Sequence, residues 1–188
     1  MADQFKSLSD DHAAFIARQH IFFCASAAEG TRINLTPRST DLLRITGPNE
    51  ALFLDLVGSS NETAAHMLAD GRLTFMFCAV AGPPMIMRLY GTGRAIHRGA
   101  EEYQKVLDTH FGTEPANARQ IFVLDFDLVQ TSCGYGVPMF DFTRERPSLE
   151  NWAKSKTADE IEAYKRKKNL VSMDGLPTGL TLNDVPKA

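Results

Sequence analysis

The sequence is poor in the residues that build disulfide frameworks and metal sites. Its 188 residues include only three cysteines, and Cys24, Cys78 and Cys133 are widely separated and odd in number. This spacing argues against a disulfide framework and against a zinc site of the Cys-x-x-Cys type. The five histidines show neither His-x-His nor His-x-x-x-His spacing. We therefore predict no metal site.

The sequence also lacks an excess of positive charge and long apolar runs. Its formal net charge is -3, whereas a duplex-binding protein usually carries a basic face. No apolar run approaches the roughly 18 residues that a membrane span requires. The start, MADQFKSLSDDHAAF, lacks the basic and apolar regions of a signal peptide. We expect a cytoplasmic protein that binds neither nucleic acid nor membrane.

What is present is a series of short strand-like segments. Hydrophobic residues make up 44% of the chain, which is enough for one core and predicts a single domain over residues 1–188. Many short strands with few helices predict a mainly β fold, a β-barrel with flanking helices, and periodicity leaves an antiparallel sandwich as an alternative. Apolar or alternating runs predict strands at residues 21–27, 31–38, 42–46, 51–57, 72–80, 85–96 and 118–133. Helical patterns cover residues 9–19 and 98–111 and a charged C-terminal extension at about 148–170.

The stretch GSSNETAAH is a candidate ligand-binding loop that leads into a helix. Ser59, Ser60, Asn61 and Thr63 can donate hydrogen bonds, and exposed backbone N–H groups at a helix start favour an anion such as a phosphate. His66 follows about one turn into the helix, where its near-neutral pKa range would suit proton transfer. The alternative is that Ser60 or Asn61 merely caps a surface helix.

Arginines in two strand-like segments are further candidates. In TRINLTPR, Arg32, Asn34 and Thr36 share one face by the two-residue period, and Arg38 follows them. Arginine suits phosphate because its guanidinium can donate two parallel hydrogen bonds. Arg88 lies inside an otherwise apolar strand, where a charge needs a partner or a ligand. The alternative is that all three arginines lie on solvated strand faces.

No residue is identified as catalytic. Cys133, in TSCGYGVP, has no histidine close in sequence that could activate it, so a buried thiol in a turn is the favoured interpretation. Walker loops, Gly-x-Gly-x-x-Gly and Gly-x-Ser-x-Gly motifs are absent. Motif spacing therefore does not identify a reaction.

Three segments in order resemble one known family. IFFCASAAEGTRINLTPR, ALFLDLVGSSNETAAHMLADGRLTFMFCA and MIMRLYGTGRA resemble the pyridoxamine 5'-phosphate oxidase-like FMN-binding split barrels, and TSCGYGVPMFDF and SMDGLP resemble a bacterial subgroup. The resemblance implies a six-stranded antiparallel split barrel and a homodimer with FMN between the subunits. The cofactor-binding residues that it implies are Arg32, Asn34, Thr36, Arg38, Ser59, Ser60, Asn61, Thr63, His66 and Arg88.

The chain departs from the oxidase pattern at two places. Ser59-Ser60-Asn61 stands where the oxidase has a Ser-Arg-Lys run, so Arg32 and Arg38 are expected to supply the positive charge. The C-terminal SMDGLPTGLTLNDVPKA lacks the histidine that grips the vitamin substrate. These departures disfavour oxidation of pyridoxamine 5'-phosphate itself. We expect an FMN-dependent oxidoreductase of a different small molecule, and the alternative is a non-catalytic flavin- or haem-binding module.

Overall fold

The computed structural model describes residues 2–181, so Met1 and residues 182–188 of the expected domain lie outside the described residues. Its elements in chain order are β1 (Asp3–Phe5), α1 (Asp10–Ala17), β2 (Ile21–Ser26), β3 (Asn34–Ser39), the short 3-10 helix η1 (Thr40–Leu42), β4 (Leu43–Gly47), β5 (Glu50–Leu56), α2 (Glu62–Ala69), β6 (Arg72–Cys78), β7 (Ile86–His97), α3 (Glu101–His110), β8 (Ala118–Ser132), α4 (Ser148–Lys154) and α5 (Ala158–Lys168).

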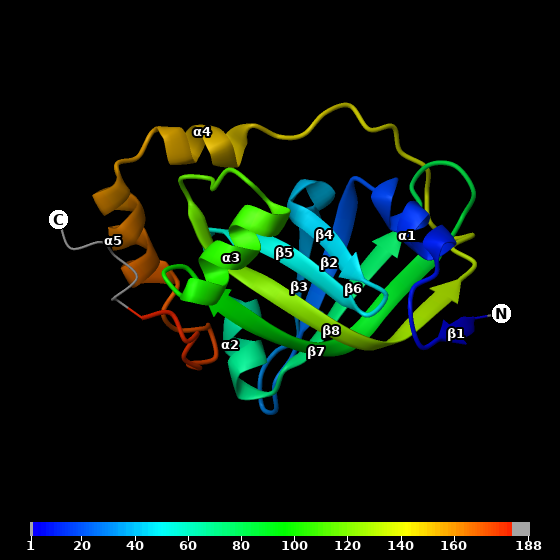
Figure 1. The fold of residues 1–188 in the computed structure, drawn as a ribbon, viewed down its shortest axis with the longest axis horizontal. Coiled ribbons are helices and arrows are strands. Elements are labelled where there is room, and N and C mark those ends of the chain that lie inside the picture. The colour runs from blue at the N-terminus through cyan, green and yellow to red at the C-terminus, as the bar shows by residue number, and fades with distance from the viewer. Residues whose placement is uncertain (1, 182–188) are drawn as a thin grey trace.

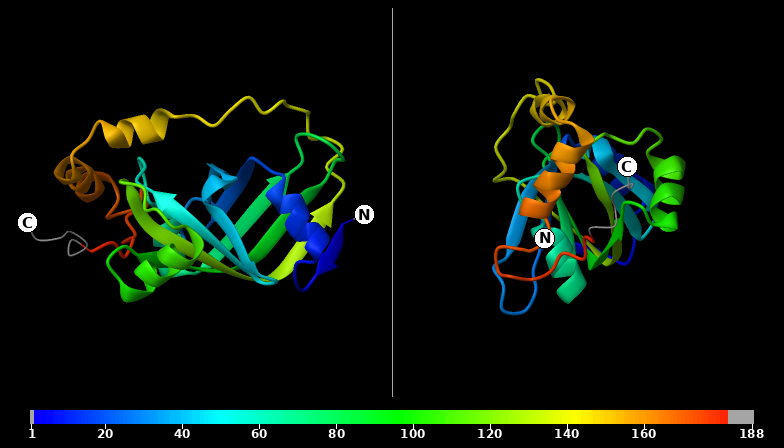
Figure 2. Two further views of the ribbon diagram at one scale, coloured as in Figure 1. Left: turned by 45° about the horizontal axis from the view of Figure 1, so that its top comes forward. Right: turned by 90° about the vertical axis from the view of Figure 1, so that its left-hand side faces the viewer.

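The eight strands of the described chain form one antiparallel sheet. Their order is β3-β2-β6-β7-β8-β5-β4, and β1 pairs with β8 outside this path. Figures 1 and 2 show that the sheet curls into a half-barrel flanked by helices. The predicted mainly β fold is therefore confirmed, with eight strands where the resemblance implies six. All seven strands expected from the sequence are present, and β1 is an additional, very short one.

The central strands β7 and β8 approach closely at a bulge. The register between them shifts between Tyr90 and Gly91. A side chain at Gly91 would overlap the backbone of Asp125 and Phe126, so this position requires glycine. A bulge increases local twist and bends the strand, which is consistent with the curl of the sheet around its concave interior.

The core lies on both faces of β5 and β8. Phe53 and Phe122 belong to the cluster inside the half-barrel. Leu54 and Ile121, their neighbours along the chain, belong to a second cluster that is covered by Tyr103 of α3. Burial on both faces explains the continuous apolar runs of β5 and of the first half of β8, whereas the second half of β8 alternates between buried and more exposed residues.

The C-terminal extension is two helices rather than the single one that the sequence analysis expects. α4 ends at Lys154 and α5 starts at Ala158. Thr157 interrupts the helix because it caps α5: its hydroxyl accepts from the Glu160 N–H, and the Glu160 carboxylate accepts from the Thr157 N–H. This reciprocal capping box stabilises a new helix start at this point.

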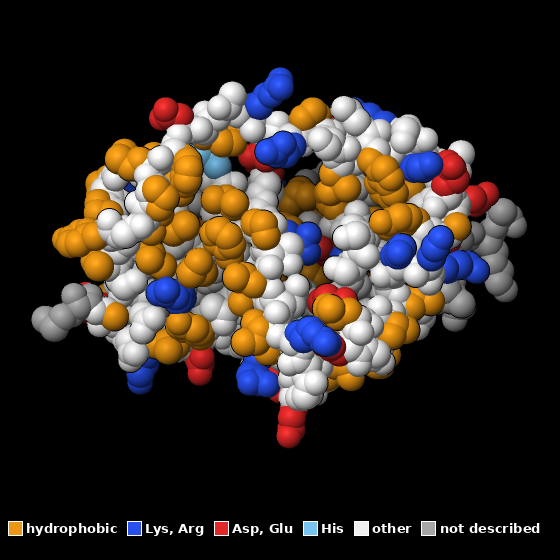
Figure 3. All heavy atoms as spheres, turned by 180° about the vertical axis from the view of Figure 1, so that it is seen from behind, with side chains coloured by type: hydrophobic (Ala, Val, Ile, Leu, Met, Phe, Trp, Pro, Cys, Tyr) orange, Lys and Arg blue, Asp and Glu red, His pale blue; other side chains and the backbone are white. Residues whose placement is uncertain are grey.

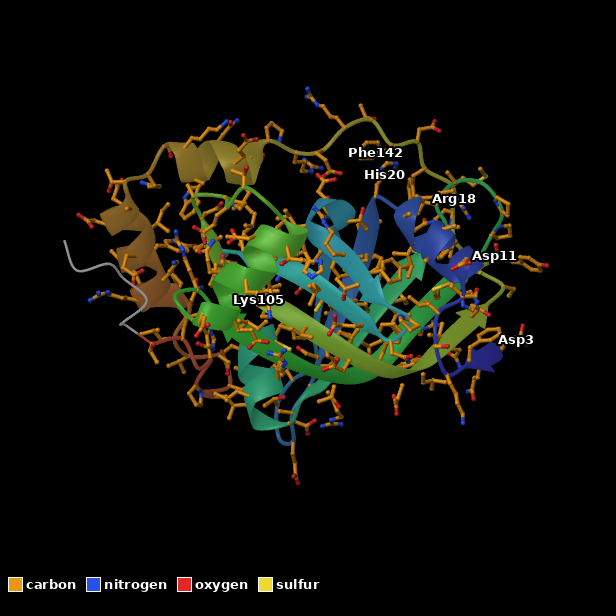
Figure 4. All side chains as sticks on the ribbon, viewed as in Figure 1. Asp3, Asp11, Arg18, His20, Lys105 and Phe142 are labelled. Carbon is orange, nitrogen blue, oxygen red and sulfur yellow. The ribbon has the colours of Figure 1, made fainter. Side chains whose placement is uncertain are left out.

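Residues 133–147 connect β8 to α4 without helix or strand and run along the outside of the molecule (Figures 1 and 2). Two contacts attach this segment to the barrel. The Phe140 N–H donates to the Val80 carbonyl at 2.9 Å, and Phe142 stacks on His20 with ring centroids 3.7 Å apart, as the labelled side chains in Figure 4 show. The large side chains of Tyr135, Phe140 and Phe142 are nevertheless exposed.

Residues 2–181 contain neither a helix suited to span a membrane nor a cluster of side chains suited to hold a metal ion. None of the helices there has the length and apolarity needed to cross a bilayer. No group of three or more histidine, cysteine, aspartate or glutamate side chains is placed to hold a metal ion in that range.

Candidate functional site

The interior of the half-barrel changes from aromatic to polar where β3 faces β2. Arg38 is paired in register with the buried Phe22, and Asn34 with the buried Ser26. The amide of Asn34 donates to Ser26 Oγ at 3.2 Å, and Thr36 Oγ1 donates to Asn34 Oδ1 at 3.1 Å. The polar side chains of β3 therefore line the interior, as the two-residue period allows, and do not form a solvated outer face.

The outward face of β3 has the opposite character. Ile33, just before the strand, is 79% exposed and Leu35 is 61% exposed. An edge strand that directs its polar side chains inward and its apolar side chains outward reverses the usual pattern of a half-buried sheet. This reversal leaves polar groups in the interior of the half-barrel and apolar side chains on its surface.

The loop from β5 to α2 closes the polar end of the interior. Asn61 occupies the N-cap position of α2 but makes no side-chain capping bond. Instead its amide donates to the Asn169 carbonyl at 3.2 Å, and its Oδ1 accepts from Gln120 Nε2 at 2.7 Å. Thr63, in the first turn, accepts from Asn34 Nδ2 at 2.9 Å. Asn61 is thus part of a buried network and is not the cap of a surface helix.

A buried carboxylate organises the charges at this site. Asp55 Oδ2 accepts from Arg119 Nε at 2.9 Å and from Gln120 Nε2 at 2.9 Å, and Arg38 Nη2 lies 3.4 Å from Asp55 Oδ1. Arg119 also donates to the Ser60 carbonyl at 2.9 Å. Two guanidinium groups around one carboxylate give this cluster a net charge of about +1, and the carboxylate of Glu62 at the start of α2 offsets that charge at the edge of the site.

These groups surround a narrow polar pocket. Within the described chain, the Nε of Arg38 is buried and has no hydrogen-bond partner. A buried donor without a partner is costly, so this atom marks the place where an acceptor would be stabilised. The pocket is lined by Asn34, Thr36, Arg38, Ser60, Asn61, Glu62, Thr63, Arg119 and Phe122.

A larger cavity of about 640 Å³ adjoins the narrow pocket at Arg38, which lines both. Figure 3 shows the surface of the molecule hollowed beneath the segment that overlies the barrel. α4 covers part of this cavity, and apolar side chains from the barrel form its floor. Its lining includes Arg38, Asp41, Leu42, Phe53, Leu56, Asn117, Glu145, Arg146, Leu149, Glu150, Ala153 and Lys154.

Six of the ten expected cofactor-binding residues line the narrow pocket, and four lie outside it. Arg32 precedes β3, is exposed and forms an ion pair with Asp174. Ser59 is exposed beside the pocket. His66 is buried behind Thr63, with Nδ1 3.1 Å from Ser26 Oγ. Arg88 lies on the opposite face from its core neighbours Met87 and Leu89 and contacts Ser132. The six that converge are Asn34, Thr36, Arg38, Ser60, Asn61 and Thr63.

The sequence analysis does not identify Asp55, Arg119 or Gln120. A signal was available, because Asp55 interrupts the apolar run ALFLDLV and Arg119 precedes the run IFVL. A charge in a buried strand needs a partner, and the same reasoning that singles out Arg88 applies to both residues.

Burial controls the thiol next to the pocket. Cys24 is fully buried, and its burial raises its pKa to about 12. Its Sγ lies 4.0 Å from Thr63 Oγ1. The thiol therefore stays protonated near neutral pH, where it is a poor nucleophile.

Comparison with known proteins gives one curated relative and a set of similar folds. The chain is 33% identical over 189 residues to the pyridoxamine 5'-phosphate oxidase family protein ustO of Aspergillus flavus, covering 92% of this chain and 76% of that protein. A HupZ variant of Group A Streptococcus superposes with a TM-score of 0.52 at 13% identity, covering 66% of this chain and 98% of that one. A candidate pyridoxamine 5'-phosphate oxidase of Lactobacillus delbrueckii superposes with a TM-score of 0.50 at 16% sequence identity, covering 66% of this chain and 94% of that one. These two structures show similarity of fold alone, and no family model matches the chain.

Proposed function

The chain belongs to the pyridoxamine 5'-phosphate oxidase family, and from this premise we propose that it binds FMN and acts as an FMN-dependent oxidoreductase on a small molecule. The observation that carries the proposal is the position of Arg38, which borders both a narrow polar pocket and a larger, partly apolar cavity. A flat ring with a phosphate tail needs this combination of spaces.

The donor groups of the narrow pocket suit a phosphate, but the open volume of the pocket is only about 10 Å³, close to the size of one water molecule, so its walls must separate to admit a phosphate. Arg38 offers an unpartnered Nε, and the cluster of Arg38, Arg119 and Asp55 carries a net positive charge. The start of α2 adds backbone N–H groups that the Asn61 side chain does not cap, and such groups favour an anion. Ser60 and Thr36 contribute hydroxyls to the lining.

The adjoining cavity fits the isoalloxazine ring. Its volume of about 640 Å³ lies within the range of small-molecule sites. Phe53, Leu42 and Leu56 provide apolar surface for a flat ring, and α4 limits access of water from one side. When bound, the flavin supplies hydride transfer, while the protein positions the ring and the substrate.

The second positive charge comes from Arg119. The sequence analysis assigns that part to Arg32, which is instead engaged by Asp174 outside the pocket. Arg119 lies next to Ser60, whose carbonyl it binds. Within this proposal, Arg119 replaces a basic residue that the oxidase pattern has in the loop itself.

We further propose that the protein is a homodimer. The support is the outward face of β3, where Ile33 and Leu35 are exposed. Exposed apolar side chains also lie on the segment 133–147, among them Tyr135 and Phe140. Large exposed apolar side chains are common at protein–protein interfaces.

A spectrum of the purified protein tests the proposed cofactor. We expect flavin absorption in the visible range and a released cofactor with the mass of FMN. Rapid bleaching by NADH or NADPH would support an oxidoreductase, and bound flavin that neither nucleotide reduces would favour a binding module. Oxygen consumption with pyridoxamine 5'-phosphate would instead indicate the oxidase reaction. Protein reconstituted with FMN that shows no binding would contradict the proposal.

A further inference from the structure

The segment after α5 folds back onto the loop that leads into α2. Asn169, at the end of α5, has no exposed surface. Its side-chain amide donates to the Gly58 carbonyl at 3.0 Å, and its own carbonyl accepts from Asn61 Nδ2 at 3.2 Å. Thr178 Oγ1 donates to the same Asn169 carbonyl at 2.7 Å. Asn169 therefore ties the first and last residues of the loop 58–61 to one point.

Two more contacts extend this attachment to both walls of the narrow pocket. The Met173 N–H donates to the Glu62 carboxylate at 3.0 and 3.2 Å, at the first residue of α2. The Asp174 carboxylate accepts from the Arg32 N–H at 2.9 Å and pairs with the Arg32 guanidinium, just before β3. The segment thus contacts both the loop before α2 and the chain before β3, which supply the opposite walls.

These contacts fix the orientation of the Asn61 side chain. Its amide is held by Asn169 and its Oδ1 by Gln120, so the side chain cannot turn to cap α2. Hydrogen bonds to buried partners restrict a side chain more than solvent-exposed ones, because breaking them leaves buried polar groups unsatisfied. The backbone N–H groups at the helix start consequently stay available to a ligand.

We propose that residues 169–174 are a positioning element for the phosphate end of the cofactor site, with Asn169 as the central positioning residue. The inference rests on the proposed FMN function. Asn169 does not line the narrow pocket, so it acts on the ligand through Gly58 and Asn61. This assigns a role to the SMDG turn, which the sequence analysis leaves without one.

A positioning role for Asn169 can be told from a merely structural one by comparing the binding of two ligands, FMN and riboflavin. A loop held in place for a phosphate affects FMN and leaves riboflavin, which lacks the phosphate, nearly unaffected. A general loss of structure weakens both ligands together. The ratio of the two dissociation constants is therefore the informative quantity.

The experiment compares Asn169→Ala with Met173→Ala. The control removes a side chain that is 70% exposed and keeps the backbone N–H that Glu62 accepts. Dissociation constants for FMN and riboflavin are measured by quenching of flavin fluorescence, and hydrogen exchange of amides 59–63 is followed in the flavin-free protein. Asp174→Asn is made in parallel, because it removes only the charge that pairs with Arg32. It still tests the proposal if Asn169→Ala fails to fold.

We expect Asn169→Ala to weaken FMN by about tenfold and riboflavin by less than about twofold, with amides 59–63 exchanging about tenfold faster. Asp174→Asn should act in the same direction to a smaller extent, and Met173→Ala should change neither readout. An unchanged ratio of the two dissociation constants with unchanged exchange overturns the positioning role. Wild-type protein that binds FMN no more tightly than riboflavin contradicts the phosphate pocket, and faster exchange in Asn169→Ala would then still support the attachment of the loop.

Discussion

Arg119 and Asp55 form an ion pair that is almost completely removed from solvent, with side chains 1% and 0% exposed and Nη2 2.5 Å from Oδ2. The pair joins β8 to β5 and directs Arg119 Nη1 to the carbonyl of Ser60. A single buried contact therefore links the sheet to the loop that forms one wall of the narrow pocket. Arg38, on the far edge strand of the sheet path, reaches the same carboxylate.

Arg119→Leu should lower the free energy of unfolding by about 3–5 kcal/mol, because it leaves the Asp55 carboxylate buried with the more distant Arg38 as its one remaining charged partner beside the neutral amide of Gln120. Urea denaturation measures the change. The double variant Asp55→Asn/Arg119→Leu removes the stranded charge as well, so it should be more stable than the single variant. A double variant less stable than Arg119→Leu would contradict this account.

Arg38→Ala should weaken FMN by about 10- to 100-fold, the range expected for a charged hydrogen bond. Arg38→Lys keeps the charge but not the Nε donor, so it should lie between Ala and wild type. Titration with FMN and riboflavin separates a phosphate contact from a ring contact. Arg94→Ala, in an exposed ion pair with Glu102, is the matched control and should bind both ligands as wild type does.

Ser60→Ala and Ser59→Ala form a second matched pair in adjacent positions. Both residues are exposed, but only Ser60 lines the narrow pocket. Only the change at Ser60 should weaken FMN, by about threefold to tenfold for one neutral hydrogen bond. Equal loss of affinity at both positions would place the ligand on the outer side of the loop.

The stability of the protein should fall as pH rises above 9. Burial raises the pKa of Cys24 from 9.0 to about 12, so between these values the unfolded thiol ionises while the folded one stays protonated. The unfolded state then binds fewer protons, and the free energy of unfolding decreases with pH. Below pH 8 this group contributes no slope. Urea denaturation from pH 7 to 10.5 tests the sign.

Cys24→Ser should reduce that slope without abolishing it. Burial and a hydrogen bond to Glu114 also raise the pKa of Tyr103, so this phenol acts in the same direction. If the free energy of unfolding depends on pH identically in Cys24→Ser and wild type, burial does not raise the pKa of Cys24. Thiol titration of the native protein provides a second check. Cys133 is exposed, so the prediction of a buried thiol there is wrong, and it should react quickly, whereas Cys24 should react only after unfolding.

Leu35→Asp should convert the proposed dimer to a monomer. The substitution places a charge on the outward apolar face of β3, where a desolvated carboxylate without a partner is costly. Sedimentation velocity gives the mass. Leu68→Asp, which changes another exposed leucine, on α2, is the control and should leave the mass unchanged. A wild-type chain that sediments as a monomer contradicts the dimer.

The strands could be predicted from sequence because their patterns are local. Alternation identifies β3 and β8, and apolar runs bounded by Gly and Pro identify β5 and β6. The order of candidate residues along β3 also gave the face that Asn34 and Thr36 share. Periodicity could not tell which face is inward, because that depends on the strands that cover it.

Local pattern could mark Asp55 and Arg119 as unusual residues but could not show that they pair at the site. Arg119 meets Asp55 only because β5 and β8 pair in a particular register, 64 residues apart in the chain. Arg32 satisfies the two-residue period but precedes the first paired residue of β3, so Asp174 can draw it away from the pocket. The break between α4 and α5, by contrast, could have been predicted from the sequence, because Thr157 and Glu160 have the spacing of a capping box.

The attachment made by Asn169 also has a consequence for biosynthesis. Arg38 leaves the ribosome early, whereas Asn169 follows about 130 residues later. At about 5–20 residues per second, translation needs roughly 7–26 seconds to bring the two together. The barrel strands therefore emerge from the ribosome before Asn169 can form its hydrogen bonds with Gly58 and Asn61. A chain that terminates before Asn169 lacks these hydrogen bonds.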